Sequence, residues 1–360
     1  MTTILEEGTA VSDENLNAYH PSLIRFDALN WLVTYDLGSS PDALDYHTRA
    51  ARTADGGRTW TDVGRLLQKR GQSTHTIRTN RMLDGRLVGF GKLEDRHGYV
   101  QRCNRETLGQ APMQLFWICS TDDGAHWSEP CLISAPFEGP TWELCHAIVE
   151  LPDGSWAAPV ATWRDWEGRL PNGQQTGILI SKDQGISWPC YGRTFDGRKT
   201  GFIHWEQSVI TMEDGSIVSI AWVFNPATGE TLPNKFTRSY DCGRTFTLPQ
   251  STGFLAQTCK LLPIGPNLAV AAFRRHDKPG LWLEMAELRD TKWNRLERIL
   301  LWNGAKSGMC ASENVADNLK ALRFGQPSMA RLDNNTIALV YWRQEGETSV
   351  IHWMRIRVGS

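Results

Sequence analysis

The chain of 360 residues lacks the features that mark nucleic-acid-binding and membrane proteins. Its formal net charge at pH 7 is only −2, so it has no electrostatic basis for binding nucleic acid or an anionic membrane. It also contains no run of 18 apolar residues, the length that a membrane-spanning helix needs. The sequence therefore predicts a soluble protein whose partners are neither nucleic acids nor membranes.

The eight cysteines form no Cys-x-x-Cys pair, and several lie inside apolar runs, where a free cysteine packs as a small hydrophobic residue. The first residues, Met-Thr-Thr-Ile-Leu-Glu-Glu-Gly, have neither a cationic start nor an apolar stretch, so they do not read as a secretory signal. We therefore expect a reduced, cytoplasmic protein that needs no metal and no cofactor.

What the chain does have is a short motif that occurs four times, with starts 67, 61 and 58 residues apart. The four copies are Thr53-Ala-Asp-Gly-Gly-Arg-Thr-Trp60, Ser120-Thr-Asp-Asp-Gly-Ala-His-Trp127, Ser181-Lys-Asp-Gln-Gly-Ile-Ser-Trp188 and Ser239-Tyr-Asp-Cys-Gly-Arg-Thr-Phe246. In each copy an Asp can accept from nearby backbone N–H groups, the Gly can adopt a positive φ, and the aromatic residue can anchor the turn. A repeat of this length predicts an architecture of similar, adjacent units.

A second element precedes the repeated motif and consists of two apolar runs joined by a tight turn. Asp84-Gly85, Asp153-Gly154 and Asp214-Gly215 each lie between such runs, and Asp-Gly in this context is a strong hairpin signal. Related pairs of apolar runs also occur at residues 21–35, ahead of the first copy of the motif, and at residues 259–273 and 327–341, where the motif has decayed. The count predicts six units, which begin near residues 19, 75, 143, 204, 256 and 323.

These units predict an all-β fold, a six-bladed β-propeller of four-stranded antiparallel blades that forms a single domain over residues 1–360. The N-terminal segment from Thr3 to Thr9 is expected to add a strand to the last blade, because closing the ring removes an exposed sheet edge.

The four copies resemble the Asp box (BNR repeat) of the sialidase superfamily, whose members are six-bladed propellers that act on carbohydrates. The resemblance implies that substrate binds where the inner strands converge, on the face opposite the Asp boxes. Two catalytic features of sialidases do not match. Tyr19 stands where the family has the first arginine of its triad, and Phe324-Gly325-Gln326 occupies the region of the nucleophilic tyrosine. Cleavage of sialic acid is therefore not expected.

Two carboxylates, Glu143 and Glu206, occupy corresponding positions at the starts of two successive inner strands. A pair of carboxyl groups that flanks a glycosidic bond is the minimum equipment for glycoside hydrolysis. The chain is similar in this respect to propeller exo-arabinanases, which use a Glu pair. The sequence thus favours an exo-acting glycoside hydrolase in which Glu143 and Glu206 are the acid and the nucleophile or base. Either Glu could instead serve as a structural partner for an Arg or a backbone N–H.

Histidines define a competing hypothesis. His75 and His146 are the remaining catalytic candidates, and together with nearby arginines they could cleave a uronate-containing glycan as a lyase does. We expect them to share one pocket with His20, Glu143 and Glu206. A metal held by the three histidines is a weaker alternative, and a non-catalytic glycan-binding propeller is the third possibility. The oligomeric state cannot be predicted. The candidate substrate-binding residues are His20, Arg78, Arg164, His204, Trp205, Arg275, Gln326 and Arg343.

Overall fold

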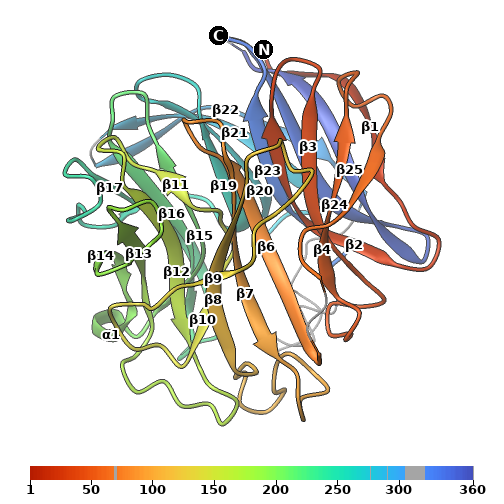
Figure 1. Cartoon of the computed structure of the whole chain (residues 1–360). Helices are drawn as coiled ribbons and strands as arrows, with labels where there is room; N and C mark the ends of the chain where they lie inside the picture. Colours follow the sequence, from red (N-terminus) through yellow and green to blue (C-terminus); the bar gives the residue numbers. More distant parts are fainter. Residues whose placement is uncertain (69–70, 276, 290, 305–320, 360) are drawn as a thin grey trace.

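The computed structural model describes residues 1–68, 71–275, 277–289, 291–304 and 321–359. Its strands form six separate antiparallel sheets, and Figure 1 shows these sheets as the blades of one propeller. Each blade begins with its innermost strand and continues outward. No helix in the described part of the chain is long and apolar enough to cross a membrane.

The first three blades come from the N-terminal half of the chain. Blade 1 contains β2 (Asn17–Arg25), β3 (Trp31–Gly38), β4 (His47–Thr53) and β5 (Thr61–Arg65). Blade 2 contains β6 (Ser73–Arg81), β7 (Leu87–Asp95), β8 (Met113–Ser120) and β9 (Cys131–Leu132). In blade 3 the inner strand is interrupted, so β10 (Thr141–Glu143) and β11 (Val149–Glu150) both pair with β12 (Trp156–Trp163), which is followed by β13 (Gln175–Ser181) and β14 (Cys190–Asp196).

A short helix, α1 (Gly197–Thr200), leads into the second half. Blade 4 contains β15 (Ile203–Thr211), β16 (Ile217–Asn225), β17 (Glu230–Ser239) and β18 (Gln250–Ser251). Blade 5 contains β19 (Ala256–Pro263), β20 (Leu268–Arg275), β21 (Leu281–Arg289) and β22 (Lys292–Trp302). Blade 6 contains β23 (Phe324–Arg331), β24 (Thr336–Glu345), β25 (Thr348–Arg357) and, as its outermost strand, β1 (Thr3–Val11).

The predicted fold is confirmed. The six inner strands begin at residues 17, 73, 141, 203, 256 and 324, each within two residues of the predicted start. The expected ring closure is also present, because β1 pairs antiparallel with β25 along its length. The first and last segments of the chain are therefore joined in one sheet, which is why the two termini lie close together in Figure 1.

The four copies of the repeated motif form the same turn. In the third copy the Ser181 hydroxyl donates to Asp183 at 2.7 Å, and the Gly185 N–H donates to the Ser181 oxygen at 2.8 Å. The Ser187 N–H then donates to Asp183 Oδ1 at 2.9 Å. The equivalent bonds occur around Asp55, Asp122 and Asp241. The predicted turn, in which the Asp carboxylate accepts a backbone N–H, is thus present in every copy.

The glycine of each turn also contacts the preceding blade. A Cβ added to Gly185 would lie 2.7 Å from the Trp117 ring in blade 2, and one added to Gly243 would lie 2.5 Å from Ile178 in blade 3. These glycines have a positive φ as well, of 92° and 76° respectively. Glycine is therefore required twice, by the backbone conformation and by the close approach of the neighbouring blade.

The hydrophobic core is divided into six layers, one between each pair of adjacent blades. Tryptophans fill several of them. Trp31 in blade 1 lies 5.8 Å, centroid to centroid, from Trp353 in blade 6, and Trp117 in blade 2 lies 5.4 Å from Trp156 in blade 3. Because this packing is between blades, the inner edges of the sheets remain available to line the axis.

Candidate functional site

The inner strands share a backbone irregularity near their starts. His20, Glu206, Thr258 and Gln326 all have a positive φ, between 43° and 54°. Each lies where the inner strand holds one residue more than its partner strand. Residues other than glycine rarely adopt this conformation, and such strain is concentrated at functional sites. In blade 2 the pairing of β6 with β7 is regular, and in blade 3 the inner strand is interrupted directly after Glu143.

The two candidate carboxylates lie together at these irregular positions. Glu143 Oε2 accepts the backbone N–H of Glu206 at 3.2 Å. Glu206 Oε2 in turn accepts the backbone N–H of Thr258, and it accepts the Thr258 hydroxyl at 3.1 Å. An inner strand is a sheet edge with unpaired backbone N–H groups, so each carboxylate satisfies one such group on the next blade. Both glutamates therefore connect successive blades at the axis.

The surroundings of Glu143 favour its protonated form. Burial raises the pKa of Glu143, and the negative charge of Glu206 adds to this rise. The Cys145 thiol and the Lys260 ammonium act in the opposite direction but do not cancel it. A carboxyl group whose pKa is raised toward neutrality beside a second carboxylate has the property that a general acid needs.

Arg274 contacts Thr258, which donates to Glu206, and it was not among the residues chosen from the sequence. Its side chain is buried; it donates from Nη1 to the Phe324 carbonyl at 2.7 Å and from Nε to Gln257 at 3.2 Å. A Cβ at position 325 would lie only 2.2 Å from Nη1, so Gly325 leaves the room that this guanidinium occupies. The chosen neighbour, Arg275, is instead paired with Asp277 at 2.6 Å. Adjacent strand residues face opposite sides, and the sequence could not tell which side faced the axis.

A buried cluster in blades 1 and 2 surrounds Asp36, which sequence reasoning also missed. His20 Nδ1 lies 3.3 Å from Asp36 Oδ2 and 2.9 Å from the Tyr46 hydroxyl. Arg78 donates to the same carboxylate oxygen at 3.0 Å. Burial alone would raise the pKa of Asp36, but Arg78 and His20 lower it by more, so the carboxylate stays charged. Burial also lowers the pKa of His20 to about 4, which keeps the imidazole neutral at pH 7.

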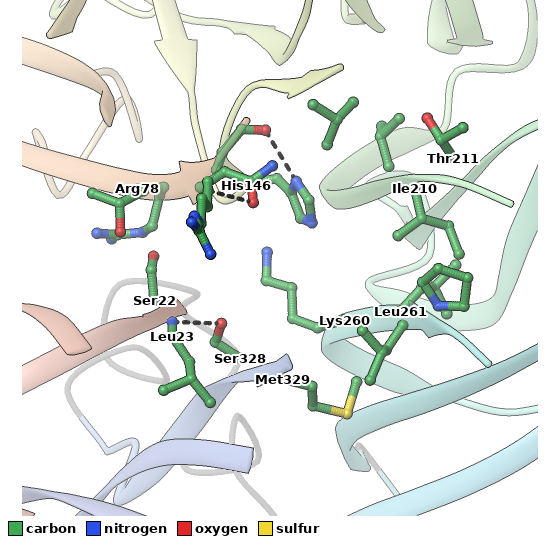
Figure 2. A pocket seen from close by; sticks show the side chains of 18 of the residues that line it. Ser22, Leu23, Arg78, His146, Ile210, Thr211, Lys260, Leu261, Ser328 and Met329 are labelled. Atoms are coloured by element: carbon green, nitrogen blue, oxygen red, sulfur yellow. Dashed lines mark hydrogen bonds between the residues drawn. The ribbon is translucent and has the colours of Figure 1, made fainter. Parts of the chain in front are cut away.

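A cavity of about 450 Å³ lies on the axis and is lined by residues from all six inner strands. We call it the axial cavity. Arg78, His146 and Lys260 line the end nearer the strand starts, which we call the inner end, and Figure 2 shows the Lys260 side chain extended toward the middle. Its other end reaches the hairpin turns between the first and second strands of the blades, near Leu83 and Pro152. This end is on the same side of the propeller as the repeated turns.

Two hydrogen bonds cross the axis at the inner end of this cavity. The Lys260 ammonium from blade 5 and the Gln326 amide from blade 6 both donate to the Cys145 carbonyl in blade 3, the latter at 3.4 Å. The residues that line the axial cavity follow His20, Glu143 and Glu206 along their strands. The carboxylate pair therefore lies beyond the inner end of the cavity, toward the strand starts, and does not line it.

The structure does not bring the five residues His20, His75, His146, Glu143 and Glu206 into one pocket, as the sequence had suggested. Only His146 lines the axial cavity. His75 is buried against blade 1, where its Nε2 accepts the Thr48 N–H at 3.3 Å. The reason is geometric, since one residue of register decides whether a strand side chain faces the axis or a neighbouring blade.

The other predicted substrate-binding residues are distributed around the same face. His204 is buried and stacks on Phe195 at 5.0 Å. Trp205 packs on Trp163 at 4.5 Å, and the Arg164 guanidinium lies over that same ring. Arg343 forms an ion pair with Glu345. Gln326 is buried, and its amide donates to the Cys145 carbonyl, two residues after Glu143.

A sequence signal for the irregular strands does exist. Ser22, Ser208 and Ser328 each follow a positive-φ residue by two positions. The Ser208 hydroxyl accepts the Leu261 N–H of the next blade at 3.1 Å, and the Ser328 hydroxyl accepts the Leu23 N–H at 3.0 Å. A recurring serine at this spacing therefore marks where adjacent inner strands are joined.

The described residues contain no group of three or more His, Cys, Asp or Glu side chains that could hold a metal ion. The three histidines of the metal hypothesis are accordingly separated, with His75 at the first blade interface and His146 on the axial cavity. The seven cysteines that the structure describes are all free.

Comparison with solved structures identifies the same architecture in several proteins. A protein of unknown function from Dyadobacter fermentans superimposes with a TM-score of 0.78 at 18% identity, over 99% of both chains. An α-L-arabinanase from Penicillium chrysogenum, solved with arabinobiose, gives 0.65 at 12% identity over 98% of both chains. The Hadza microbial sialidase Hz136 gives 0.62 at 17% identity, over 94% of this chain and 65% of its own. At these identities the likeness establishes the fold.

No protein-family profile matches the chain, and no curated protein matches it in sequence.

Proposed function

We propose that this propeller is a carbohydrate-active enzyme, most specifically an exo-acting glycoside hydrolase that uses Glu143 and Glu206. The observation that carries the proposal is the pair of carboxylates joined by the hydrogen bond from the Glu206 N–H to Glu143, with Glu206 at a strained backbone position and the pKa of Glu143 raised by burial and by its neighbour. The likeness of the fold to a sialidase and an arabinanase supports the choice of substrate class. The resemblance of the four turns to the Asp box points the same way.

In this proposal Glu143 is the general acid that protonates the glycosidic oxygen. Glu206 is the nucleophile or base, and the Thr258 N–H and hydroxyl hold its carboxylate in a fixed orientation. Arg274 Nη2 in turn donates to the Thr258 hydroxyl oxygen at 3.5 Å. His20, whose side chain is 30% exposed, remains a candidate for contacting sugar hydroxyls. We keep Arg164, Trp205 and Arg343 as candidates for the rim. We do not retain the catalytic role suggested for His75 or the binding roles suggested for His204 and Arg275.

The test is a substrate screen followed by conservative variants. The purified protein is incubated with sialosides, arabinans, rhamnosides and uronate-containing glycans, and new reducing ends and unsaturated uronate are measured separately. On the substrate found, Glu143→Gln and Glu206→Gln should each lower kcat by about 10²- to 10⁴-fold. The matched control is Glu230→Gln, which changes an exposed glutamate in blade 4 and should keep full activity.

A lyase is the second candidate, because His146 lines the axial cavity together with Arg78 and Lys260. His146 would be the base and the cations would neutralise a uronate carboxylate. In that case unsaturated uronate should accumulate, His146→Asn should be inactive, and both Gln variants should remain active. A protein that binds glycan but releases neither product would instead be a non-catalytic module, and the proposal of an enzyme would be wrong.

A further inference from the structure

The axial cavity contains a buried cation that forms no direct ion pair with the described residues. The Lys260 side chain is only 7% exposed, and its ammonium donates to the Cys145 carbonyl. No carboxylate in the described part of the chain forms an ion pair with it. Burying an ammonium is unfavourable, and burial lowers the pKa of Lys260 although the charges of Glu143 and Glu206 act in the opposite direction. A negatively charged ligand would remove this cost.

Arg78 supplies a second unsatisfied donor at the same end of the cavity. Its guanidinium is 5% exposed, and two of its nitrogens donate to Asp36 and to the Ile77 carbonyl. The third nitrogen, Nε, is buried without a hydrogen-bond partner among the described residues. Buried polar groups in proteins almost always have a partner, so the free Nε indicates a position for a ligand acceptor.

His146 adds an acceptor to this arrangement. Its Nδ1 lies 3.1 Å from the Ala147 carbonyl, which can only accept, so Nδ1 carries the hydrogen and Nε2 is left as an acceptor. Burial, together with the charge of Lys260, lowers the pKa of His146 to about 3, so the ring is neutral at pH 7. Figure 2 shows the ring beside Lys260 at the inner end of the cavity. A ligand hydroxyl could donate to Nε2.

The remaining walls and the size of the cavity limit the ligand further. Val209, Ile210, Leu261 and Met329 provide apolar surface beyond the charged end. A volume of about 450 Å³ lies within the range of sites that take small molecules. The ligand should therefore combine one carboxylate, at least one hydroxyl and a compact body with apolar C–H faces.

We propose that the axial cavity is a binding site for a small hydroxycarboxylate, the class that includes the sugar acids. The ligand carboxylate contacts Lys260 and Arg78, and a ligand hydroxyl donates to His146. The site differs from the Glu143 and Glu206 pair, because neither glutamate lines the axial cavity. The inference goes beyond the proposed hydrolase and does not depend on it.

The experiment measures binding of D-glucuronate to the full-length protein by titration calorimetry, with D-glucose as the matched ligand that lacks the carboxylate. Glucuronate should bind and glucose should not. Lys260→Gln keeps a donor for the Cys145 carbonyl but removes the charge, and it should weaken binding of glucuronate about 10- to 100-fold. Lys278→Gln changes an exposed lysine of the same blade and is the control that should bind like the wild type.

Two further measurements keep the result unambiguous. Melting of the free proteins should show that Lys260→Gln is at least as stable as the wild type, because the variant removes a buried charge whose desolvation outweighs the attraction of its neighbours. Glu206→Gln should retain binding of glucuronate even if it abolishes hydrolysis, which separates this site from the proposed active site. Equal binding of glucuronate and glucose, unchanged binding by Lys260→Gln, or loss of binding by Glu206→Gln would each overturn the proposal.

Discussion

The repeated turns and the irregular inner strands are two sets of structural repeats that differ in one respect. In the turns both backbone and sequence repeat, since Asp55, Asp122, Asp183 and Asp241 accept the same hydrogen bonds. In the inner strands the backbone repeats but the residue does not. The positive-φ position is occupied by His20, Glu206, Thr258 and Gln326 in four different blades.

The repeated turn residues maintain the ring of blades, whereas the residues that differ at the positive-φ positions are candidates for the functional site. A turn that packs on the preceding blade tolerates only a few residue types, so its residues are repeated. Its glycine contacts the neighbouring blade directly. A strained position on the axis needs only a backbone that the rest of the blade holds in place, which leaves its side chain free to differ. Diversity at a repeated backbone position is therefore the better indicator of a functional site in this molecule.

The largest effect on stability is expected from Trp188→Ala in the third turn. Trp188 is buried in the layer between blades 2 and 3, and its Nε1 donates to the Gly185 carbonyl at 3.2 Å. Removing the ring should lower the free energy of unfolding by about 3–5 kcal/mol, measured by urea denaturation.

The matched control for this variant is Trp127→Ala, at the same position of the second turn but only partly buried. It should cost clearly less. Equal costs at the two positions would mean that the motif itself, and not burial between blades, determines stability. Neither variant should change kcat of the folded protein.

A smaller effect is expected from Gly325→Ala on the inner strand of blade 6. The added methyl group would lie 2.2 Å from Arg274 Nη1, so the guanidinium must move away from the Phe324 carbonyl. Overpacking of this kind typically costs about 1–3 kcal/mol of stability. Gly265→Ala is the control, because a Cβ there has only ordinary contacts, and its effect should be within about 0.5 kcal/mol. If Gly325→Ala lowers stability without lowering activity, Arg274 does not support the proposed active site.

The fold and part of the candidate site could be predicted from the sequence. The fold could be predicted because Asp, Gly and Trp recur at fixed spacing and each has one local reason to do so. Glu143 and Glu206 could be found as ionisable residues at strand starts. Asp36 and Arg274 could not, because their roles depend on which face of a strand meets the next blade, where Asp36 binds Arg78 and Arg274 binds the Phe324 carbonyl. For the same reason the sequence suggested that His75 would line the pocket.

The pH dependence of activity should depend on Glu143. A general acid must be protonated, and burial raises the pKa of Glu143, so activity should fall as the pH rises through that raised value. Cys145→Ser changes the thiol whose hydrogen bond opposes this rise and should shift the alkaline limb of kcat/KM. An alkaline limb that is unchanged in the residual activity of Glu143→Gln would contradict the assignment of Glu143 as the acid.

The smallest effect is expected from Asp183→Asn, and it should depend on pH. Hydrogen bonds from the Ser187 and Ser181 hydroxyls and from the Ser187 N–H lower the pKa of Asp183 to about 2, from an ordinary value of 3.8. Because the folded-state pKa is the lower one, the stabilisation is fully present above pH 4 and is lost as the pH falls toward 2. The difference in melting temperature between wild type and variant should therefore be largest above pH 4 and shrink below it. Ser187→Ala removes one donor to the same carboxylate and should reproduce part of this dependence, whereas a difference that stays constant from pH 6 to pH 2 would show that the charge of Asp183 does not stabilise the turn.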